Sequence, residues 1–529
     1  MKPTPFFYVL LVFFFTFSGL SAQDGVYLKG VLKDADTREP VVFATVRIKG
    51  KALGVISNQD GGFLIPETLA QEGTVLQVSS MGYETKEIPV SALEVSGIST
   101  ILLRAAVEQL PETVVTAKRR GRLSARKIIQ YALEKIPENY PTTPFGLVGY
   151  YRDYQLQRHA YSNLNEAIVA VFDKGFQSDD YKQTQYGMYS YKKNTEFKID
   201  SFAAKPYDYG AQDKIIPNAS LISDYGGNEL VILHIHDAIR NHNVRAYSFV
   251  HKLVEDFVRE HRFSSVSQTS YGDEQVYKIR VKKMMLPFRV EGAIYIDKKD
   301  FAIRKLDYAV YKKEPDKNPD GPNDYSGEEK LLYEILVEYT KVDGLMYLNY
   351  ISFHNKFRLI RPPVFRIEEI VLDKDLGYLQ IKLNRPAMSF DRLKPSDIRL
   401  SYAGQFLKPA DWILVDSTEI GLKLNAKQQT RLKDMVYSEK EVTKRPKILL
   451  QIEKLVDKDG NQLGERKIDI LDQFREFFTQ KIMEGETVKP PENKLMLKTK
   501  PLYDASQPML NRKASDSYWM NTPLRKVSN

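Results

Sequence analysis

The histidines are the side chains best suited to acid–base or metal chemistry in this chain, and three of them lie close together. His234 and His236 flank Ile235 and precede Asp237, and His242 follows shortly after. Two histidines at positions i and i+2 of a strand share one face and could chelate zinc. No third ligand is defined, and no glutamate has the spacing of an H-E-x-x-H motif. The sequence therefore predicts no metal site. His234, His236 and His242 are the candidate ligands for the alternative, a zinc site.

A second set of oxygen ligands lies near the C-terminal part of the chain. Asp457, Asp459 and Asn461 alternate along the sequence, a spacing that suits calcium. A complete calcium loop would also need a late glutamate, which is absent. A plain hairpin turn is the favoured prediction.

Motifs of enzymatic catalysis are missing from the sequence. It contains no G-x-S-x-G, no phosphate-binding loop, no dinucleotide fingerprint and no H-x-x-E zinc motif. It also contains no cysteine, which excludes thiolate catalysis, disulfides, cysteine-bound zinc and an acylated cysteine anchor. We therefore predict no catalytic residues, no cofactor and no enzymatic activity.

Composition indicates a folded chain with several domains. The 529 residues are 43% hydrophobic and 27% charged, which is ordinary for globular proteins that bury a core. The net charge of +9 is spread along the chain rather than focused, so we expect no nucleic-acid partner. The 32 tyrosines and 26 phenylalanines favour sheet.

Residues 1–22 have the features of a secretory signal peptide. Lys2 gives the positive start, Phe6–Phe17 is the apolar stretch, and small residues precede an expected cleavage before Gln23. No later stretch is long and apolar enough for a spanning helix. The sequence therefore predicts an exported protein in the periplasm or associated with the outer membrane, with no transmembrane helix after signal removal.

Residues 23–104 show short apolar runs that alternate with turn signals, the pattern of an all-β sandwich. Val41–Ile48 is rich in β-branched residues, and Asn58–Gly62 is a turn whose glycines allow positive φ. Phe63–Ile65 then begins a new strand, which ends at Pro66. This is the most regular pattern in the chain.

These residues also resemble a known family, the carboxypeptidase-regulatory-like domain, at residues 26–104. The resemblance implies a transthyretin-like β-sandwich, common in exported and outer-membrane proteins of Bacteroidetes, that lacks catalytic residues. The matching positions are Gly30, Pro40, Ala44, Gly50, Gly54, Ser57, Asp60, Gly61, Phe63, Ser79, Gly82 and Tyr83.

Residues 105–122 follow as a linker that resembles the segment after this module in TonB-dependent outer-membrane transporters. No plug pattern follows, so a transporter is not the favoured interpretation. From 123 to 373 the sequence predicts an α+β antiparallel-sheet domain with helices after Ser124 and over 245–261. Strands over 290–306 resemble lipoprotein-carrier-like folds, in which a curved sheet wraps a helix.

Two further parts complete the predicted organisation. Residues 374–470 read as an all-β domain that resembles Ig-like sandwiches of bacterial surface proteins. Residues 471–529 are predicted to be a short helix at 474–478 and an extended tail. The fold class is thus mainly β and multi-domain: an N-terminal sandwich, then a β-rich α+β body with a curved antiparallel sheet and a few helices.

Three functional hypotheses fit these features. The first is an exported cell-envelope protein that is non-enzymatic and serves binding, scaffolding or outer-membrane assembly. The second is an outer-membrane or transporter-associated component, and the third is a metal-dependent hydrolase. Candidate partners are other envelope proteins, lipid or glycan.

Overall fold

The structure is a computed structural model, and the parts of the chain that it describes form two compact units. It describes residues 26–524 except 52, 107–122, 159, 209, 217–226, 246–248, 272–273, 315–327, 374, 389, 433–435, 439–447, 485–491 and 512–516. Unit 1 takes the described residues of Met1–Pro206, Pro217–Lys356 and Asp472–Asn529, and unit 2 those of Tyr207–Ile216 and Phe357–Leu471. The predicted signal peptide and nearly all of the predicted linker lie outside the described residues. The predicted module boundaries stay predictions.

The N-terminal part of unit 1 is the predicted β-sandwich. One sheet has the order β4-β1-β7 and the other β3-β2-β5-β6. Gly30 of β1 lies opposite Phe63 of β4, and a Cβ at Gly30 would come within 2.2 Å of the Phe63 ring, so only glycine fits. The elements are β1 (Tyr27–Asp34), β2 (Thr45–Ile48), β3 (Gly54–Ile56), β4 (Gly62–Pro66), η1 (Glu67–Leu69), β5 (Val75–Ser79), β6 (Lys86–Pro89), η2 (Val90–Ala92) and β7 (Ile98–Leu103).

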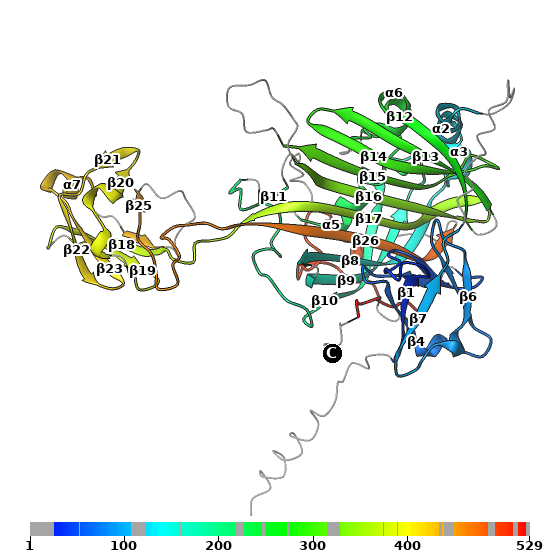
Figure 1. Cartoon of the computed structure of the whole chain (residues 1–529), viewed down its shortest axis with the longest axis horizontal. Coiled ribbons are helices and arrows are strands. Elements are labelled where there is room, and N and C mark those ends of the chain that lie inside the picture. Colours follow the sequence, from blue (N-terminus) through cyan, green and yellow to red (C-terminus); the bar gives the residue numbers. More distant parts are fainter. Residues whose placement is uncertain are drawn as a thin grey trace, which may run out of the picture. The chain divides into compact units, whose positions relative to one another are not determined.

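The body of unit 1 is a large, curved sheet with the order β10-β9-β8-β26-β17-β16-β15-β14-β13-β12 (Figure 1). Neighbours in sequence pair antiparallel from β12 to β17 and from β8 to β10. The mainly β fold with a curved antiparallel sheet is thus confirmed. The strands are β8 (Phe145–Gln157), β9 (Ala160–Asp173), β10 (Gln185–Lys193), β12 (Arg262–Tyr271), β13 (Glu274–Met285), β14 (Phe288–Asp297), β15 (Ile303–Lys313), β16 (Glu329–Val342), β17 (Leu345–Ile360) and β26 (Ile468–Glu484).

Alternating side chains explain why these segments form strands. In β15, Leu306, Tyr308 and Val310 are buried in the main core, while the alternate residues Lys305 and Asp307 lie on the opposite face. Side chains of a strand point alternately to its two faces, so one face can be apolar. β14 and β16 alternate in the same way, so the apolar faces of these neighbouring strands form one continuous surface on the sheet.

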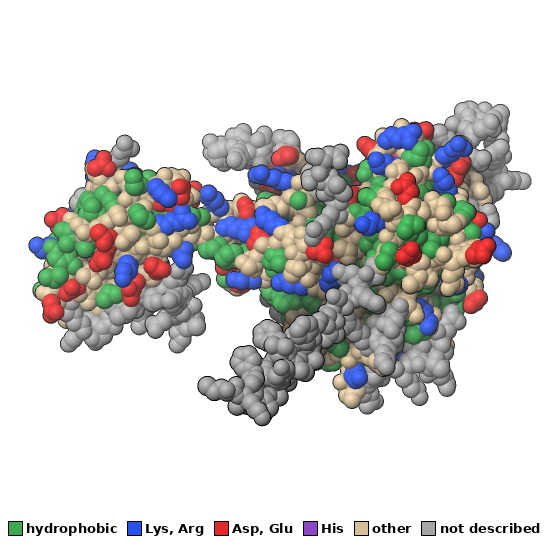
Figure 2. Space-filling model, turned by 90° about the horizontal axis from the view of Figure 1, so that it is seen from below, with side chains coloured by type: hydrophobic (Ala, Val, Ile, Leu, Met, Phe, Trp, Pro, Cys, Tyr) green, Lys and Arg blue, Asp and Glu red, His purple; other side chains and the backbone are tan. Residues whose placement is uncertain are grey.

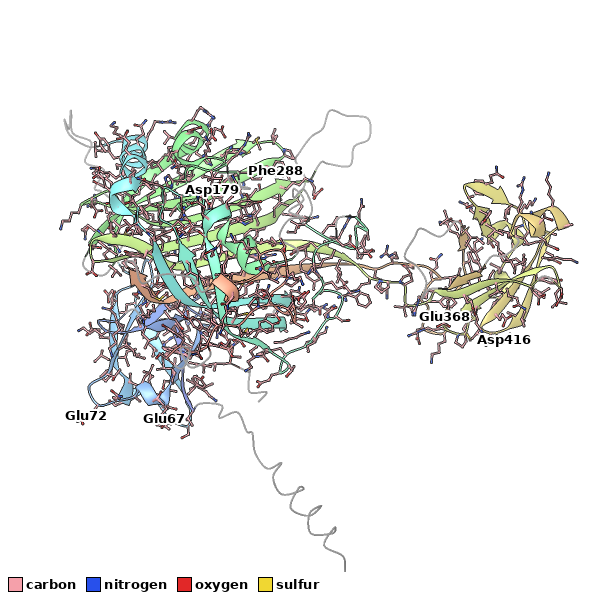
Figure 3. The ribbon with its side chains drawn as sticks, turned by 180° about the vertical axis from the view of Figure 1, so that it is seen from behind. Glu67, Glu72, Asp179, Phe288, Glu368 and Asp416 are labelled. Carbon is pink, nitrogen blue, oxygen red and sulfur yellow. The ribbon has the colours of Figure 1, made fainter. Side chains whose placement is uncertain are left out.

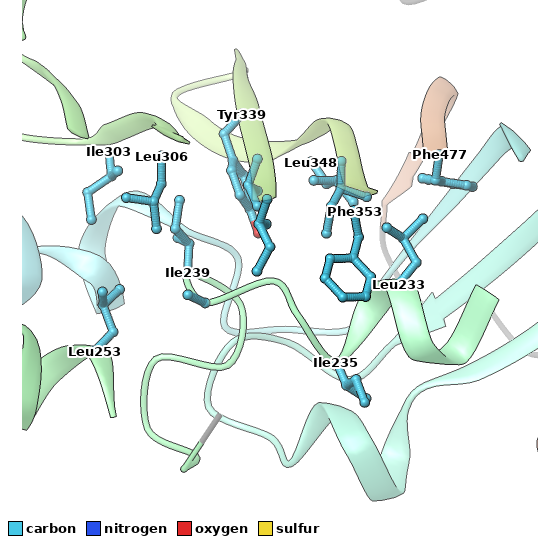
Figure 4. Packing of buried hydrophobic residues seen from close by; sticks show 14 of the residues in the cluster. Leu233, Ile235, Ile239, Leu253, Ile303, Leu306, Tyr339, Leu348, Phe353 and Phe477 are labelled. Carbon is cyan, nitrogen blue, oxygen red and sulfur yellow. The ribbon is translucent and has the colours of Figure 1, made fainter. Parts of the chain in front are cut away.

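Short helices cover that apolar surface and close the core (Figure 4). Leu233, Ile235 and Ile239 from the α5 region meet side chains such as Tyr339 and Phe353 from the sheet. Ser124 caps α2 as predicted, with its hydroxyl accepting from the Lys127 N–H. The helices are α2 (Ala125–Glu134), α3 (Ile136–Asn139), α4 (Asp180–Gln183), α5 (Glu229–His234), the π-helix η4 (Leu253–Phe257) and α6 (Val258–Glu260). No helix in the described part of the chain is long and apolar enough to cross a membrane.

The predicted helix at 474–478 is wrong, because this segment is the middle of strand β26. Phe474, Phe477 and Phe478 have helical spacing, which suggested one apolar face. In the strand, Phe477 instead enters the main core, while Phe474 and Phe478 enter clusters on the opposite face. Both faces of β26 are covered, so its sequence does not alternate between polar and apolar residues.

The predicted helix over 245–261 is also largely wrong. Within it, only Leu253–Glu260 is helical, and residues 246–248 lie outside the described residues. Lys252 is extended and His251 has a φ of 56°, so the helix begins late. Leu253 and Phe257 still reach the core from this short element. Tertiary packing therefore overrides the helical period of the sequence.

Unit 2 is an all-β domain of two sheets, in the orders β22-β23-β19-β18-β24 and β21-β20-β25. In addition, β11 (Lys214–Ile215) pairs with the end of β17. Figure 3 labels Glu368 and Asp416 in this unit. Its other elements are β18 (Ile367–Asp373), β19 (Tyr378–Leu383), η5 (Phe390–Arg392), η6 (Pro395–Asp397), β20 (Ile398–Tyr402), β21 (Gln405–Leu407), β22 (Asp411–Asp416), β23 (Glu419–Lys423), α7 (Ala426–Arg431), β24 (Val436–Ser438) and β25 (Ile448–Ile452).

The Asp457–Asn461 segment of unit 2 forms a tight turn. The Asp457 carboxylate accepts from the backbone N–H groups of Asp459 and Asn461, each at 2.9 Å. Arg385 lies 3.4 Å from Asp457 and 3.1 Å from Asp459. The turn prediction is confirmed, since these oxygens serve the local backbone and an arginine.

The sandwich packs on the outer face of the large sheet, opposite the main core. Phe43 and Ile56 of the sandwich join Tyr350 of β17 and Phe478 of β26 in one apolar cluster. The guanidinium of Arg47 donates to the Asn349 side chain at 2.6 Å. These contacts fix the sandwich to the sheet at β17 and β26.

A buried ion pair extends this attachment to β8 and the C-terminal tail. Arg152 Nε donates to Glu476 at 2.6 Å, and its guanidinium also donates to Asn58 of the sandwich. Tyr154 donates to the same glutamate at 2.5 Å. Asn521 of the tail donates to the carbonyl of Ile56 at 2.6 Å. The network thus joins four distant segments of the chain: the sandwich, β8, β26 and the C-terminal tail.

We predict that Arg152→Leu lowers the free energy of unfolding by about 3–5 kcal/mol, because it leaves the Glu476 carboxylate buried without its cation. Urea denaturation measures this loss. The exposed pair Lys49–Glu87 provides the control, and Lys49→Leu is expected to cost less than about 1 kcal/mol. Equal, small losses for both variants would contradict a structural role for the buried pair.

Candidate functional site

The segment from Asn228 to His242 brings most of the predicted chemical residues to the inner side of the large sheet. Asn228 caps α5 by accepting from the Val231 N–H at 3.2 Å. The helix ends at His234, and the chain then continues in turns. The buried polar residues of this segment are His234, His236, Asp237, Arg240, Asn241 and His242.

The predicted strand geometry at His234 and His236 is wrong, because His234 ends a helix. The two side chains therefore diverge. His234 lies against the rings of Tyr186 and Phe477, with centroid distances of 5.4 and 5.3 Å. His236 stacks on Phe353 at 4.1 Å.

His242 has a third, separate environment. Its Nδ1 lies 3.1 Å from the Ile239 carbonyl, and its ring packs near Phe176. Across the residues that the structure describes, no three His, Asp or Glu side chains are placed to hold a metal ion. The structure thus keeps His234, His236 and His242 apart, each against aromatic rings.

Burial determines the protonation of these histidines. It lowers the pKa of His234 to about 4 and the pKa of His236 to about 4. Both rings are therefore neutral near neutral pH. Among the described residues, none forms a hydrogen bond with the buried Nε2 atom of His234, an arrangement that fits packing better than proton transfer.

Arg240 is the charged centre of this region. Its Nε and Nη2 donate to the two oxygens of Asp173 at 2.7 and 2.9 Å, a bidentate pair. The same guanidinium donates to the Ser178 hydroxyl at 2.8 Å and lies 5.2 Å from the Phe176 ring centre. This pairing ties the turn after α5 to β9 and to the loop before α4.

Asp237 is the carboxyl group of the Asn228–His242 segment whose pKa is raised. Burial raises its pKa to about 6, although it accepts from the N–H groups of Arg240 and Ile239 and from the Tyr339 hydroxyl at 2.7 Å. A raised carboxyl pKa is a common property of general acids. Here the carboxylate already caps a turn and holds a tyrosine, so its contacts account for it structurally.

An open polar pocket lies beside this cluster, with a volume of about 610 Å³. Ser178 connects the two, since it lines the pocket and accepts from Arg240. The lining consists of Lys174, Gln177, Ser178, Lys182, Gln183 and Gln185. Ammonium, carboxamide and hydroxyl groups can bind anionic or hydroxyl-rich ligands, but they include no activated nucleophile or base.

Sequence reasoning missed a charged ladder on the outer face of the sheet. His354 of β17 lies between Glu334 of β16 at 2.9 Å and Asp472 of β26 at 2.8 Å. Its ring stacks on Phe474 at 4.0 Å. Burial disfavours the imidazolium, but hydrogen bonds to Asp472 and Glu334 outweigh it and raise the pKa of His354. The three residues are distant in sequence, and only strand register brings them together.

The comparisons with known proteins concern the N-terminal part of the chain. Residues 28–115 match the CarboxypepD_reg-like domain, which confirms the resemblance. Ninety residues are 37% identical to part of the TonB-dependent receptor SusC of Bacteroides thetaiotaomicron. This alignment covers 17% of the present chain and 8% of the receptor. No solved structure matches the chain.

We predict that His234→Phe raises stability at low pH. The folded pKa of about 4 is below the unfolded value of about 6.5, so the unfolded chain binds more protons between these values and wild-type stability falls as pH drops below 6.5. At pH 5 the variant should be more stable than wild type by about 2 kcal/mol, and at pH 8 the two should be similar. Urea denaturation at both pH values measures this.

The same variant tests the metal hypothesis. Elemental analysis should find no stoichiometric zinc in either the wild-type protein or His234→Phe. Zinc that is present in the wild type and lost in the variant would favour the hydrolase hypothesis.

We predict the opposite pH response for His354→Gln. Since the folded pKa of His354 is raised, its stabilisation is fully present below the unfolded pKa and is lost as pH rises through the folded pKa. Because Glu334 and Asp472 are partly exposed, the variant should lose only about 1 kcal/mol at pH 5.5, and less at pH 9. A loss that is constant with pH would show that the ring stack alone matters.

Proposed function

We propose that this is an exported cell-envelope protein that acts by binding or scaffolding, without enzymatic activity, at or near the outer membrane. The observation that carries the proposal is the attachment of the regulatory-like sandwich to the outer face of the curved sheet. The apolar cluster around Tyr350 and Phe478 and the buried Arg152–Glu476 pair make the sandwich part of one body. Such a body offers fixed surfaces to partners.

The inner side of the sheet supports this proposal over acyl-chain binding. Buried side chains from α2, α5, η4 and the strands pack into one large cluster there (Figure 4). Lipoprotein-carrier-like folds would instead keep an apolar space for acyl chains on this side. The polar lining near Ser178 favours a glycan or an anionic headgroup as a small ligand.

The envelope location is supported by the N-terminal sequence and the domain comparison. Residues 1–22 have signal-peptide features, and the sandwich is similar to a segment of a protein named as a TonB-dependent receptor. A transporter-associated component is therefore the second candidate. It differs from the first in requiring a receptor as the partner.

Cell fractionation tests the location. The tagged full-length protein should be found with the envelope, and a variant that lacks residues 1–22 should stay in the cytoplasm. Equal distribution of both forms would contradict export.

Chemical cross-linking in intact cells separates the two candidates. Recovery of a TonB-dependent receptor as the main cross-linked partner would favour the transporter-associated role. Cross-links to other envelope components would favour the scaffold. The control is Arg47→Ala, which removes the hydrogen bond between Arg47 of the sandwich and Asn349 of the sheet. It leaves the exposed residues of unit 2 unchanged.

A further inference from the structure

Strand β22 (Asp411–Asp416) is an edge strand of the five-stranded sheet in unit 2. It pairs with β23 on one side only, with Trp412 opposite Leu422 and Leu414 opposite Ile420. Within the described part of the chain, no strand pairs with its other side. An open edge presents unpaired N–H and C=O groups to any extended chain.

The side chains of this edge are apolar and exposed. Ile413, Leu414 and Val415 have exposed fractions of 41%, 46% and 52%. Successive side chains alternate between the faces of a strand, so both faces of β22 present apolar surface. Hydrophobic side chains gather at the end of unit 2 where Figure 1 labels β22, as Figure 2 shows.

The strand before β22 in the chain also carries an exposed aromatic side chain. β21 is the edge of the second sheet of unit 2, and only residues 408–410 separate it from β22. Its Phe406 side chain is 82% exposed.

This edge has no charged residue, lysine or proline in its middle, and its one register shift lies at its C-terminal end, between Leu414 and Asp416. Exposed edges commonly carry lysine, proline or a charge in the middle of the strand. Here the middle positions are Trp412, Ile413, Leu414 and Val415, and the charges lie only at the ends, at Asp411 and Asp416. An apolar open edge of this kind is a site where another strand can add.

We propose that β22 binds an extended segment of a partner protein by strand addition, and that this segment has apolar residues flanked by lysine or arginine. Backbone hydrogen bonds would supply affinity, and alternate apolar side chains would meet Leu414 on one face and Ile413 and Val415 on the other. Asp411 and Asp416 would pair with the basic flanks.

The charges of the edge favour this occupant over a second copy of the chain. Strands β22 and β23 together carry three acidic residues and one lysine: Asp411, Asp416, Glu419 and Lys423. If two β22 strands paired antiparallel about their centre, Asp411 of each would lie opposite Asp416 of the other. Like charges directly opposite each other destabilise a strand pair.

Peptide binding to the purified protein tests the proposal. The probe is a labelled octapeptide of alternating valine and threonine with lysine at both ends, and we expect a dissociation constant on the order of 100 µM. The same peptide with glutamate at both ends should bind at least about five-fold more weakly, because the basic flanks are lost. Alternate N-methylation removes the backbone donors and should abolish binding.

Protein variants locate the site. Leu414→Lys should weaken binding of the lysine-flanked peptide at least about ten-fold, since it places a cation in the middle of the edge. The matched control is Leu376→Lys, which changes an exposed leucine of a turn in unit 2 and should have no effect. Asp411→Lys should shift the preference toward the glutamate-flanked peptide, a result that loss of folding could not produce.

Three outcomes would overturn the proposal. One is the absence of binding by the lysine-flanked peptide, and another is equal binding by its N-methylated form. The third is a concentration-dependent dimer in sedimentation that Leu414→Lys abolishes, which would assign the edge to a second copy of the chain.

Discussion

The pairing of β26 with β8 and β17 is the constraint on which the rest of unit 1 depends. β26 is the strand between them, so it joins the part of the sheet built from β8–β10 to the part built from β12–β17. The chain leaves unit 1 after Lys356 and returns at Asp472, so this pairing must form across the whole of unit 2. Without it, β8 and β17 would each be an open edge in the middle of the molecule.

β26 is a central strand that is covered on both faces, so each polar or charged group that it buries needs a hydrogen-bond or ion-pair partner. Phe477 fills the inner core, and Phe478 meets the sandwich on the outer face. Its charged residues are buried as well: Arg475 pairs with Glu229, and Glu476 pairs with Arg152. Buried charges require such partners, because removing one leaves the other desolvated and alone. The ion pairs therefore tie α5 and β8 to the same strand.

In this arrangement the regulatory-like sandwich has a structural role, because it packs on the large sheet. The module carries no catalytic motif, and its Phe43 and Arg47 contact the sheet rather than an open site. The inner side of the sheet is packed with side chains. The polar pocket near Ser178 and the strand edge of unit 2 are the exposed features on which the proposals for this protein rest.

His234 and His354 show that this fold places histidine in two very different environments. His234 is packed among rings and kept neutral by burial, whereas His354 is held between two carboxylates that favour its charge. The spacing of His234 and His236 in the sequence made His234 a candidate ligand, whereas no sequence pattern indicated a role for His354. His354 is on β17 and its partners are on β16 and β26, so only sheet register brings them together.

The sequence by itself determined the features that depend on local pattern. The turns and β-branched runs of the sandwich, the Ser124 cap and the alternation of β13–β16 are all encoded within short segments, where period and turn chemistry act directly. Tertiary structure decided the rest. Phe474–Phe478 became a strand because it fills the gap between β8 and β17, and His234–Asp237 became a helix end because the inner face of the sheet required a cover. Non-local pairing and two-sided burial remove the periodicity on which sequence reasoning relies, since both faces of such a segment must be apolar or paired.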